Sequence, residues 1–276
     1  MPLEARVIVV ERRAPPLQAG LVPVQPRVMH PTFLVIGAAR SGTTTLFNLL
    51  SAHPQIYLPK DKRPEPHFFL KDSEYAQGLD YYESRWFAEV DEPARGEVST
   101  SYLYQPWVPE RINSHYPDMQ FIAILRDPIE RAWSNYWHSV RNGLEKESFD
   151  FAVRNEAARI RDTDEAWKQV APYAYVDRGL YAGQLQRFFE SFPQEQFFIQ
   201  TFESFFVDPL TEFGKLIDFL GVDRDVNATV EVAITNRSAP QDETMDLETR
   251  RYLEGVFEQP NRELAALLDL DLSVWS

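Results

Sequence analysis

The chain has 276 residues, of which 44% are hydrophobic and 13% aromatic, and its formal net charge at pH 7 is −14. This length is sufficient for one large α/β domain with a substantial core. The acidic balance argues against nucleic acid as a partner, because a phosphate backbone is bound by an excess of lysine and arginine. Since the chain has no cysteine, disulfide bonds and thiolate chemistry are excluded.

Residues 1–31 contain six prolines, and this density predicts an extended N-terminal arm with a short strand over residues 7–10. The arm lacks the apolar core of a signal peptide, and the chain has no run of about 18 apolar residues. We therefore expect no membrane span and a cytoplasmic protein. Residues 32–276 show no internal repeat, and we interpret them as a single domain.

Strands are predicted at 32–36, 120–125 and 196–201, and the first two are continuous apolar runs, as expected of strands buried on both faces. Helices are predicted at 43–52, 128–140, 179–191, 209–220, 243–257 and 261–269, and the segment 144–176 is interpreted as polar helix and loop. Strands that alternate with helices are typical of a parallel sheet covered on both faces. The expected fold is therefore α/β, a P-loop-like three-layer fold with a central, mainly parallel sheet flanked by helices.

The stretch Gly37-Ala-Ala-Arg-Ser-Gly-Thr-Thr-Thr45 lies between the first strand and the first helix. Its glycines have the spacing of a P-loop, G-x-x-x-x-G-K-[ST]. The N–H groups of Ser41 to Thr44 could bind phosphate oxygens at the helix N-terminus, and the three threonine hydroxyls could add hydrogen bonds. An ordinary glycine-containing turn is the alternative interpretation.

One part of the P-loop is missing, because Thr43 follows Gly42 where the nucleotide-hydrolysing form has lysine. The cation inside the loop is Arg40. Such a loop is a poor match for ATP hydrolysis and suggests a nucleotide that carries another group. The candidate cofactor-binding residues of this loop are Arg40, Ser41, Gly42, Thr43, Thr44 and Thr45.

Arg126 forms a second candidate site, at the end of the apolar strand 120–125. A Walker B strand would end here in an aspartate for Mg²⁺, whereas arginine calls for an anion. The next helix has a strong start, with Asp127 as N-cap, Pro128 as its first residue and Glu130 closing a capping box. The alternative role for Arg126 is a structural ion pair with Glu130 or Asp127.

Glu65 forms a third candidate site, because it stands between two prolines and is followed by His67 and two phenylalanines. The prolines hold the segment extended. The aromatic pair can exclude water and raise the pKa of the carboxyl group toward a range useful for a general base. The alternative is a surface loop with an incidental glutamate.

Together these three motifs resemble those of the PAPS-dependent sulfotransferases, within them the heparan-sulfate-type and bacterial branch, and the resemblance covers about residues 32–275. The loop 37–45 is similar to the family's 5′-phosphosulfate-binding loop. Residues 125–136 are similar to its 3′-phosphate-binding strand and helix, which implies that Arg126 and Ser134 hold the 3′-phosphate. The segment from Glu65 to Phe69 is similar to the one that carries the family's catalytic glutamate.

The resemblance implies transfer of a sulfuryl group from 3′-phosphoadenosine 5′-phosphosulfate (PAPS), which leaves PAP. The acceptor would be a hydroxyl, or less often an amine, of a sugar, a lipid-linked saccharide or a secondary metabolite. Glu65 would be the general base of an in-line displacement, and His67 would assist it, contact the substrate or orient the loop. Arg40 takes the place of the family's usual lysine and would act as an electrostatic clamp, and no metal is expected.

Two departures from the family pattern bear on the substrates. Val98 stands where heparan-type members often have lysine, so a strongly sulfated polysaccharide is a less favoured acceptor. In the late loop that closes over the nucleotide, residues 236–238 lack the family's glycine, and Arg237 is a candidate contact of the 3′-phosphate. Arg178 and Tyr181 are candidates for the substrate cleft.

Two other functions stay open at this point. A nucleotide kinase or another P-loop phosphotransferase would need a lysine after Gly42 and an aspartate for Mg²⁺, and neither stands at the expected place. A non-catalytic nucleotide-binding protein of the same fold would keep the loop and lose the chemistry. The sequence determines neither the acceptor nor the oligomeric state.

Overall fold

A five-stranded sheet organises the fold, with the strand order β2-β3-β1-β4-β5 and parallel pairing throughout. The computed structural model describes residues 28–59, 65–164, 167, 169–224, 240 and 243–275. The strands are β1 (Phe33–Gly37), β2 (Ile56–Tyr57), β3 (Ala94–Val98), β4 (Gln120–Leu125) and β5 (Phe197–Thr201).

Helices connect these strands and extend beyond them. They are α1 (Thr43–Ala52), α2 (Asp72–Tyr75), α3 (Leu79–Trp86), α4 (Val108–Asn113), α5 (Pro128–Arg141), α6 (Phe149–Arg154), α7 (Glu156–Arg161), α9 (Tyr181–Phe189), α10 (Phe202–Val207), α11 (Pro209–Phe219) and α12 (Leu247–Leu268). Three short 3₁₀ helices are η1 (Asp177–Gly179), η2 (Gln194–Gln196) and η3 (Ser273–Trp275).

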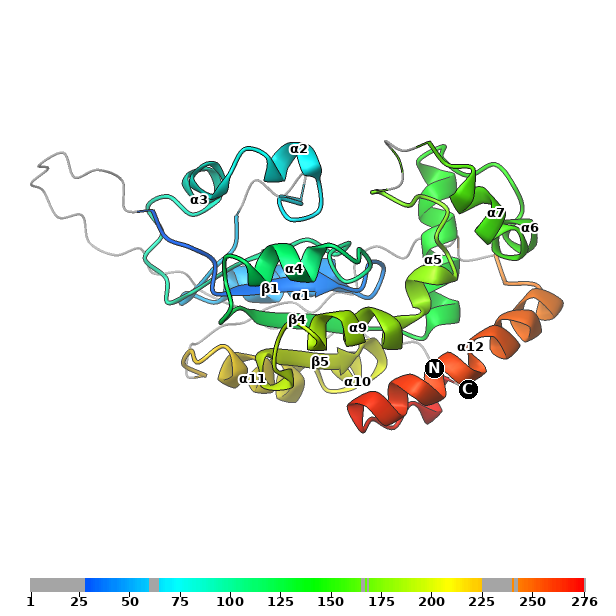
Figure 1. Ribbon diagram of the computed structural model, residues 1–276. Coiled ribbons are helices and arrows are strands. Elements are labelled where there is room, and N and C mark those ends of the chain that lie inside the picture. The colour runs from blue at the N-terminus through cyan, green and yellow to red at the C-terminus, as the bar shows by residue number, and fades with distance from the viewer. Residues whose placement is uncertain are drawn as a thin grey trace, which may run out of the picture.

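Alternating side chains of the sheet form two separate cores. Leu34 and Ile36 of β1 are fully buried in the core that α4 and α9 cover. Phe33 and Val35 point to the opposite face and pack with α1, α10 and α11. Figure 1 shows α4 and α9 in front of the sheet and α1 behind it. The predicted three-layer fold with a parallel sheet is confirmed.

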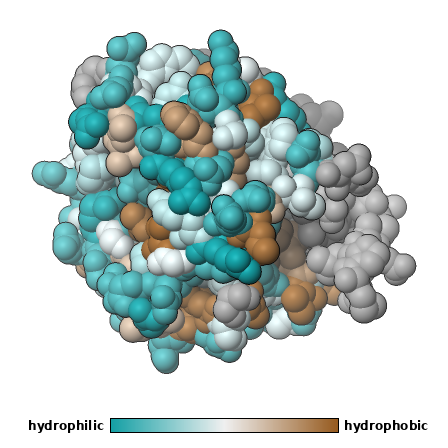
Figure 2. Space-filling view, turned by 90° about the vertical axis from the view of Figure 1, so that its right-hand side faces the viewer, coloured by the Kyte–Doolittle hydropathy of each residue, from teal (hydrophilic) through white to brown (hydrophobic). Residues whose placement is uncertain are grey.

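The carboxyl ends of the strands meet at one edge of the sheet, where α5 begins immediately after β4 (Figure 1). A third core lies beside this edge, where α5, α6 and α12 pack through residues such as Tyr136, Phe149 and Leu253. Figure 2 views this side and shows hydrophilic residues over most of it, with hydrophobic side chains set between them. In the described ranges, no helix combines the length and apolar character that a membrane crossing requires.

The N-terminal arm is described only over its last residues. Val28 forms an isolated antiparallel bridge with Ala88, and Met29 N donates to Phe87 O at 3.3 Å. Residues 28 and 29 are thus attached to the segment after α3. The predicted strand over residues 7–10 lies outside the described residues.

Strand β3 was not predicted, because its sequence Ala-Arg-Gly-Glu-Val has no apolar run. It pairs with β1 through the register Phe33–Gly96 and Leu34–Glu97. Arg95 is buried but donates to His30 O at 3.0 Å and to Glu92 O at 2.6 Å. Burial of polar side chains is tolerated where their hydrogen bonds are made, and hydropathy alone does not reveal such a strand.

The prediction of two helices at 243–257 and 261–269 was wrong, since α12 is one helix of 22 residues that contains Pro260. Its buried residues Leu253, Phe257 and Leu264 lie on both sides of the proline. Packing of this continuous apolar face compensates for the hydrogen bond that proline cannot donate.

The start of α5 agrees with the prediction in part. Asp127 Oδ1 accepts from Ile129 N at 2.8 Å, which confirms the N-cap. The capping box with Glu130 was wrong, because Asp127 N donates to Glu203 Oε1 of α10 at 3.1 Å. Glu130 instead pairs with Arg250 of α12 at 2.5 Å. A charged guanidinium attracts a carboxylate more strongly than a neutral N–H does.

Candidate functional site

The loop between β1 and α1 requires glycine at position 42 for two reasons. Gly42 has φ +78°, in the left-handed region, and stands as the N-cap of α1. A Cβ at this position would lie 2.7 Å from Cε2 of Phe206 and 3.0 Å from the ring of Phe202. The loop therefore passes close to α10, and both its conformation and its surroundings exclude a larger residue.

The N-terminus of α1 presents groups that can bind an anion. The first helical hydrogen bonds run from Thr45 N and Leu46 N to Gly42 O, at 3.0 and 3.1 Å. The N–H groups of Thr43 and Thr44 precede them at the positive end of the helix dipole. Ser41 is fully buried, and its Oγ has no hydrogen-bond partner in the described part of the chain.

The three successive threonines are placed differently. Thr43 and Thr45 are buried, with 9% and 3% exposure, whereas Thr44 is exposed. Successive helical side chains point about 100° apart, so the three hydroxyls cannot converge on one ligand. Binding of phosphate oxygens by their hydroxyls stays a prediction.

Arg40, Arg126 and Ser134 come together at the carboxyl ends of the neighbouring strands β1 and β4. Arg40 Nε donates to Ser134 Oγ at 3.4 Å, and Arg126 Nη1 donates to Arg40 O at 3.3 Å. The Arg126 guanidinium also lies over the Phe202 ring, 5.0 Å from its centre. Two cations and a hydroxyl thus adjoin the loop, an arrangement suited to phosphate groups.

An ion pair with Glu130 does not explain the position of Arg126. Their closest approach is 4.0 Å, whereas Glu130 contacts Arg250 at 2.5 Å. The backbone of Arg126 is held separately, because Tyr181 donates its hydroxyl to Arg126 O at 2.9 Å. Tyr181 therefore positions the backbone at the end of β4. The side chain of Arg126 is oriented by its hydrogen bond to Arg40 O in the loop.

Glu65 is held beside this loop through the segment that follows β3. Its Oε2 accepts from Thr100 N at 3.1 Å, and the Thr100 hydroxyl lies 3.4 Å away. A Cβ on Gly37 would lie 3.5 Å from Thr100 O and 3.0 Å from Cβ of Leu103. Gly37 thus allows the 100–103 segment to pass against the start of the loop, and the carboxylate reaches the same edge of the sheet.

His67 faces the same carboxylate, with Nε2 3.4 Å from Oε2 of Glu65. Burial, together with the charges of Lys71 and Arg178, lowers the pKa of His67 to about 4. The ring is therefore neutral near pH 7, and an Nε2–H tautomer can donate to Glu65. The buried Nδ1 has no partner among the described residues, so His67 is poised to accept one more hydrogen bond.

A second carboxylate, Glu97, was not singled out as a site residue by the sequence. It is fully buried at the end of β3 and accepts from Tyr82 OH at 2.9 Å. Burial raises its pKa to about 7, and Glu65 adds a smaller repulsive contribution. Its place directly before Val98, a position already matched to the family pattern, is the signal that could have found it.

Arg178, a candidate for the substrate cleft, connects two segments near Glu65. Its Nη2 donates to Val170 O at 2.8 Å, and both Nη atoms lie 3.4 Å from Ser101 Oγ. Burial lowers its pKa to about 10, so it keeps its charge at neutral pH. The backbone before it is fixed by Glu156, which accepts from Val176 N and Asp177 N at 2.6 and 2.7 Å.

Two further predictions concern the late loop and a metal ion. Arg237 and the rest of the late loop lie outside the described residues. The described ranges contain no group of three or more histidine, aspartate or glutamate side chains that could hold one metal ion.

Comparison with known proteins identifies the family to which this geometry belongs. The family model described as the sulfotransferase domain matches residues 30–246. This span contains the loop 37–45, Glu65 and Arg126. The chain belongs to the sulfotransferase family. The resemblance inferred from the three motifs is thereby confirmed.

Relatives of this sulfotransferase-family chain include proteins from humans and bacteria. Human heparan sulfate glucosamine 3-O-sulfotransferase 3A1 is 29% identical over 212 residues, which are 76% of this chain and 49% of the human protein. The chain thus spans about half the length of this curated relative. The crystal structure of a sulfotransferase from Alicyclobacillus acidocaldarius is 32% identical, with a TM-score of 0.76, and covers 90% of this chain and 99% of its own.

A more distant neighbour supports the fold alone. Mouse sulfotransferase SULT7A1, solved in complex with PAP, is 15% identical with a TM-score of 0.55, over 84% of each chain. Its likeness agrees with the three-layer arrangement seen here.

Proposed function

We propose that this chain transfers a sulfuryl group from PAPS to a hydroxyl group of a sugar-containing acceptor, with Glu65 as the general base. The observation that carries the proposal is the position of Glu65. Its carboxylate is held by Thr100, which abuts Gly37 at the start of the loop. A base beside a phosphate-binding loop can act on a hydroxyl placed against a group that the loop holds.

The residues of the loop fit PAPS. The buried, unpartnered Ser41 Oγ and the N-terminus of α1 suit the 5′-phosphosulfate, with Arg40 beside them. Arg126 and Ser134, each in contact with Arg40, would hold the 3′-phosphate. When bound, PAPS supplies the sulfuryl group, and the bond between sulfur and the phosphate oxygen breaks as the acceptor oxygen attacks in line.

Three side chains would have separate roles in the transfer. Glu65 would take the proton of the acceptor hydroxyl as its oxygen forms the bond to sulfur. Arg40 would stabilise the charge that develops on the departing phosphate oxygen, as a fixed cation that gives up no proton. Neutral His67, 3.4 Å from Glu65, would orient the carboxylate by donating to it.

A sugar acceptor is supported by the human relative, whose name states that it acts on glucosamine of heparan sulfate. The matched region is about half of that protein. We therefore do not extend its polymeric substrate, heparan sulfate, to this chain. Val98 also replaces the lysine that heparan-type members often have. The proposal is therefore limited to a sugar hydroxyl.

A thermal-shift experiment tests the nucleotide part of the proposal. PAP at saturating concentration should raise the melting temperature, because a ligand that binds only the native state stabilises it. ATP with Mg²⁺ should raise it much less. Stabilisation by ATP with Mg²⁺ alone would contradict the proposal and favour a phosphotransferase. Incubation with ³⁵S-labelled PAPS and a sugar acceptor should then give a labelled product.

A further inference from the structure

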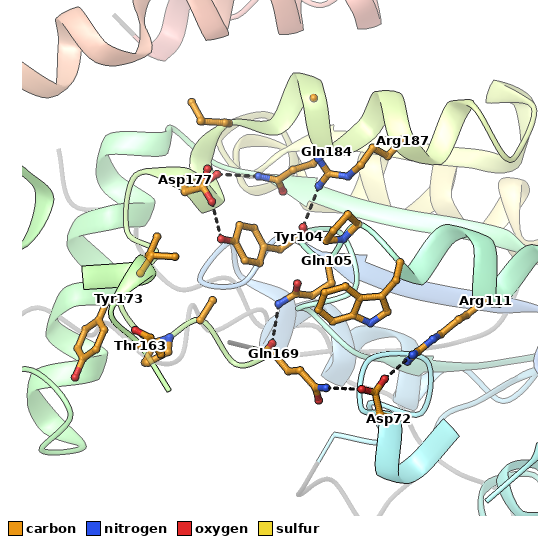
Figure 3. A pocket seen from close by; sticks show the side chains of 17 residues that line it. Asp72, Tyr104, Gln105, Arg111, Thr163, Gln169, Tyr173, Asp177, Gln184 and Arg187 are labelled. Carbon is orange, nitrogen blue, oxygen red and sulfur yellow. Dashed lines mark hydrogen bonds and ion pairs between the residues drawn. The ribbon is translucent and has the colours of Figure 1, made fainter. Parts of the chain in front are cut away.

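A large cleft is lined by described residues other than the proposed catalytic ones. Its volume is about 870 Å³, and its walls come from the start of α2, the segment before α4, the 169–173 loop, η1 and α9. Figure 3 shows Tyr104 directed toward Asp177 on one side of it, with Gln184 and Arg187 from α9 alongside. Pockets for small ligands typically have roughly 300–1,000 Å³.

A short series of contacts links this cleft to Glu65. Thr100 N donates to Glu65, and the next residue, Ser101, lies 3.4 Å from the Arg178 guanidinium. That guanidinium stacks over the Tyr104 ring, 4.7 Å from its centre, and Tyr104 lines the cleft. Through Ser101 and Arg178, the segment that holds the base is thus joined to the wall of the cleft at Tyr104.

The ionised side chains of the cleft cancel one another. Among the described residues that line it, two carboxylates, Asp72 and Asp177, balance two guanidinium groups, Arg111 and Arg187. Arg111 is paired with Asp72 at 2.5 Å, and Arg187 donates to Tyr104 O at 2.9 Å. Asp177 accepts from Tyr104 OH at 2.6 Å. A polyanion would meet carboxylates here without an excess of cations to match its charge.

The remaining walls suit sugar rings. Three aromatic side chains, Tyr104, Trp107 and Tyr173, line the cleft together with three amides, Gln105, Gln169 and Gln184, each of which already donates one hydrogen bond within the protein. Several of these groups are held in place: Trp107 Nε1 donates to Leu70 O at 3.1 Å, and Gln184 Nε2 donates to Asp177 O at 3.1 Å. Walls that are already ordered lose little conformational entropy when a ligand binds.

We infer that this cleft is the acceptor site and that it takes an uncharged polyhydroxy compound, a short neutral saccharide or its glycoside. The inference rests on the proposed sulfuryl transfer and specifies its substrate class. The size of the cleft, its balanced charge and its aromatic and amide walls carry it. A heparan-type polyanion is the occupant that the cleft disfavours.

The substrate class is tested by transfer from ³⁵S-labelled PAPS to matched acceptors. Uncharged maltotriose, tri-N-acetylchitotriose and p-nitrophenyl β-glucoside are compared with an N-sulfated heparosan hexasaccharide, at 20 and 150 mM salt. We expect kcat/KM for the best uncharged acceptor to exceed that of the hexasaccharide at least tenfold at both salt concentrations. Preference for the hexasaccharide, or no transfer to any uncharged acceptor, would overturn the inference.

The location of the acceptor site is tested by placing a larger side chain on α9, where it would occupy part of the cleft. Gly183 lines the cleft, is exposed, and has no atom within 4 Å of an added Cβ. Gly183→Leu should therefore fold normally and raise the acceptor KM at least tenfold, with unchanged affinity for PAP. Gly255 of α12 is the matched control, since it is also a helical, exposed glycine with open space around its Cβ.

The outcomes separate this inference from the proposed function. If Gly183→Leu and Gly255→Leu have the same acceptor KM while transfer proceeds, the cleft is not the acceptor site and the sulfotransferase proposal stands. If neither the native chain nor the variants bind PAP or transfer sulfate to any acceptor, the proposed function itself fails. Equal melting temperatures of the two variants would show that a change in KM is not a folding defect.

Discussion

Arg126 Nη1 donates to the main-chain oxygen of Arg40 at 3.3 Å, although the two residues lie 86 positions apart in the chain. This contact joins the end of β4 to the loop after β1. It brings two arginines to one edge of the sheet, where Glu130 approaches Arg126 only to 4.0 Å. Like charges held near each other in this way favour binding of an anion with two phosphate groups.

Arg126→Ala should weaken binding of PAP more than binding of AMP, which lacks the 3′-phosphate. Loss of a charge-assisted contact costs about 1.5–3 kcal/mol, so the dissociation constant for PAP should rise roughly 10- to 150-fold. Isothermal titration with both nucleotides measures this. Arg262→Ala on the exposed side of α12 removes the same charge and should leave both affinities unchanged. Equal losses for PAP and AMP would show that Arg126 does not read the 3′-phosphate.

Glu65→Gln should retain PAP affinity and lower turnover by about 10²–10⁴-fold, the usual contribution of a general base. The amide keeps the size of the side chain and an oxygen that can accept from Thr100 N. Steady-state kinetics with labelled PAPS and PAP titration provide the two readouts. Glu254→Gln, at an exposed position of α12, is the control. Turnover equal to that of the native chain would remove Glu65 from the mechanism.

Replacement of Arg40 should show whether the transfer depends on the positive charge of this side chain or on a proton that it donates. Arg40→Ala should lower turnover by about 10²–10³-fold, as when one group that stabilises developing charge is lost. Arg40→Lys keeps the cation but loses the Nε donor to Ser134, so we expect turnover between that of the native chain and Arg40→Ala. A lysine variant faster than the native chain, with an added basic limb in its pH–rate profile, would argue that a proton donor is preferred here.

Glu97→Gln should raise thermal stability at pH 8 and change it little at pH 5. Burial raises the folded-state pKa of Glu97 to about 7 from 4.5, so the folded state binds more protons than the unfolded state between these values. Native stability therefore falls as pH rises from about 4.5 to 7, and the penalty stays above pH 7. At one pKa unit per about 1.4 kcal/mol, the gain at pH 8 is on the order of 3 kcal/mol.

Melting curves at both pH values measure this difference. The amide oxygen of the variant can still accept from Tyr82 OH. A variant that is less stable at pH 8 than the native chain would show that the hydrogen bonds of the ionised carboxylate with Tyr102, Tyr82 and Ser99 outweigh the cost of its burial.

Much of the fold could be predicted because its signals are local. The strands β1 and β4 are apolar runs, β5 contains the apolar residues 197–199, and α1 and α5 begin at a glycine loop and at an aspartate–proline cap. From the sequence by itself, the loop 37–45, Arg126 and the Glu65 segment could be predicted as three separate candidate motifs. This was possible because each depends on residue types and spacings within a few positions.

Other features were decided only by the tertiary structure, because their partners are distant in the chain. β3 is stable because its buried Arg95 finds carbonyl oxygens of the arm and loop, and Glu130 turns to Arg250 because α12 packs beside α5. The meeting of Arg40 with Ser134, and the cleft whose arginines are paired or hydrogen-bonded, likewise arise from folding. Charge balance and proximity depend on three-dimensional packing, and a one-dimensional pattern carries neither.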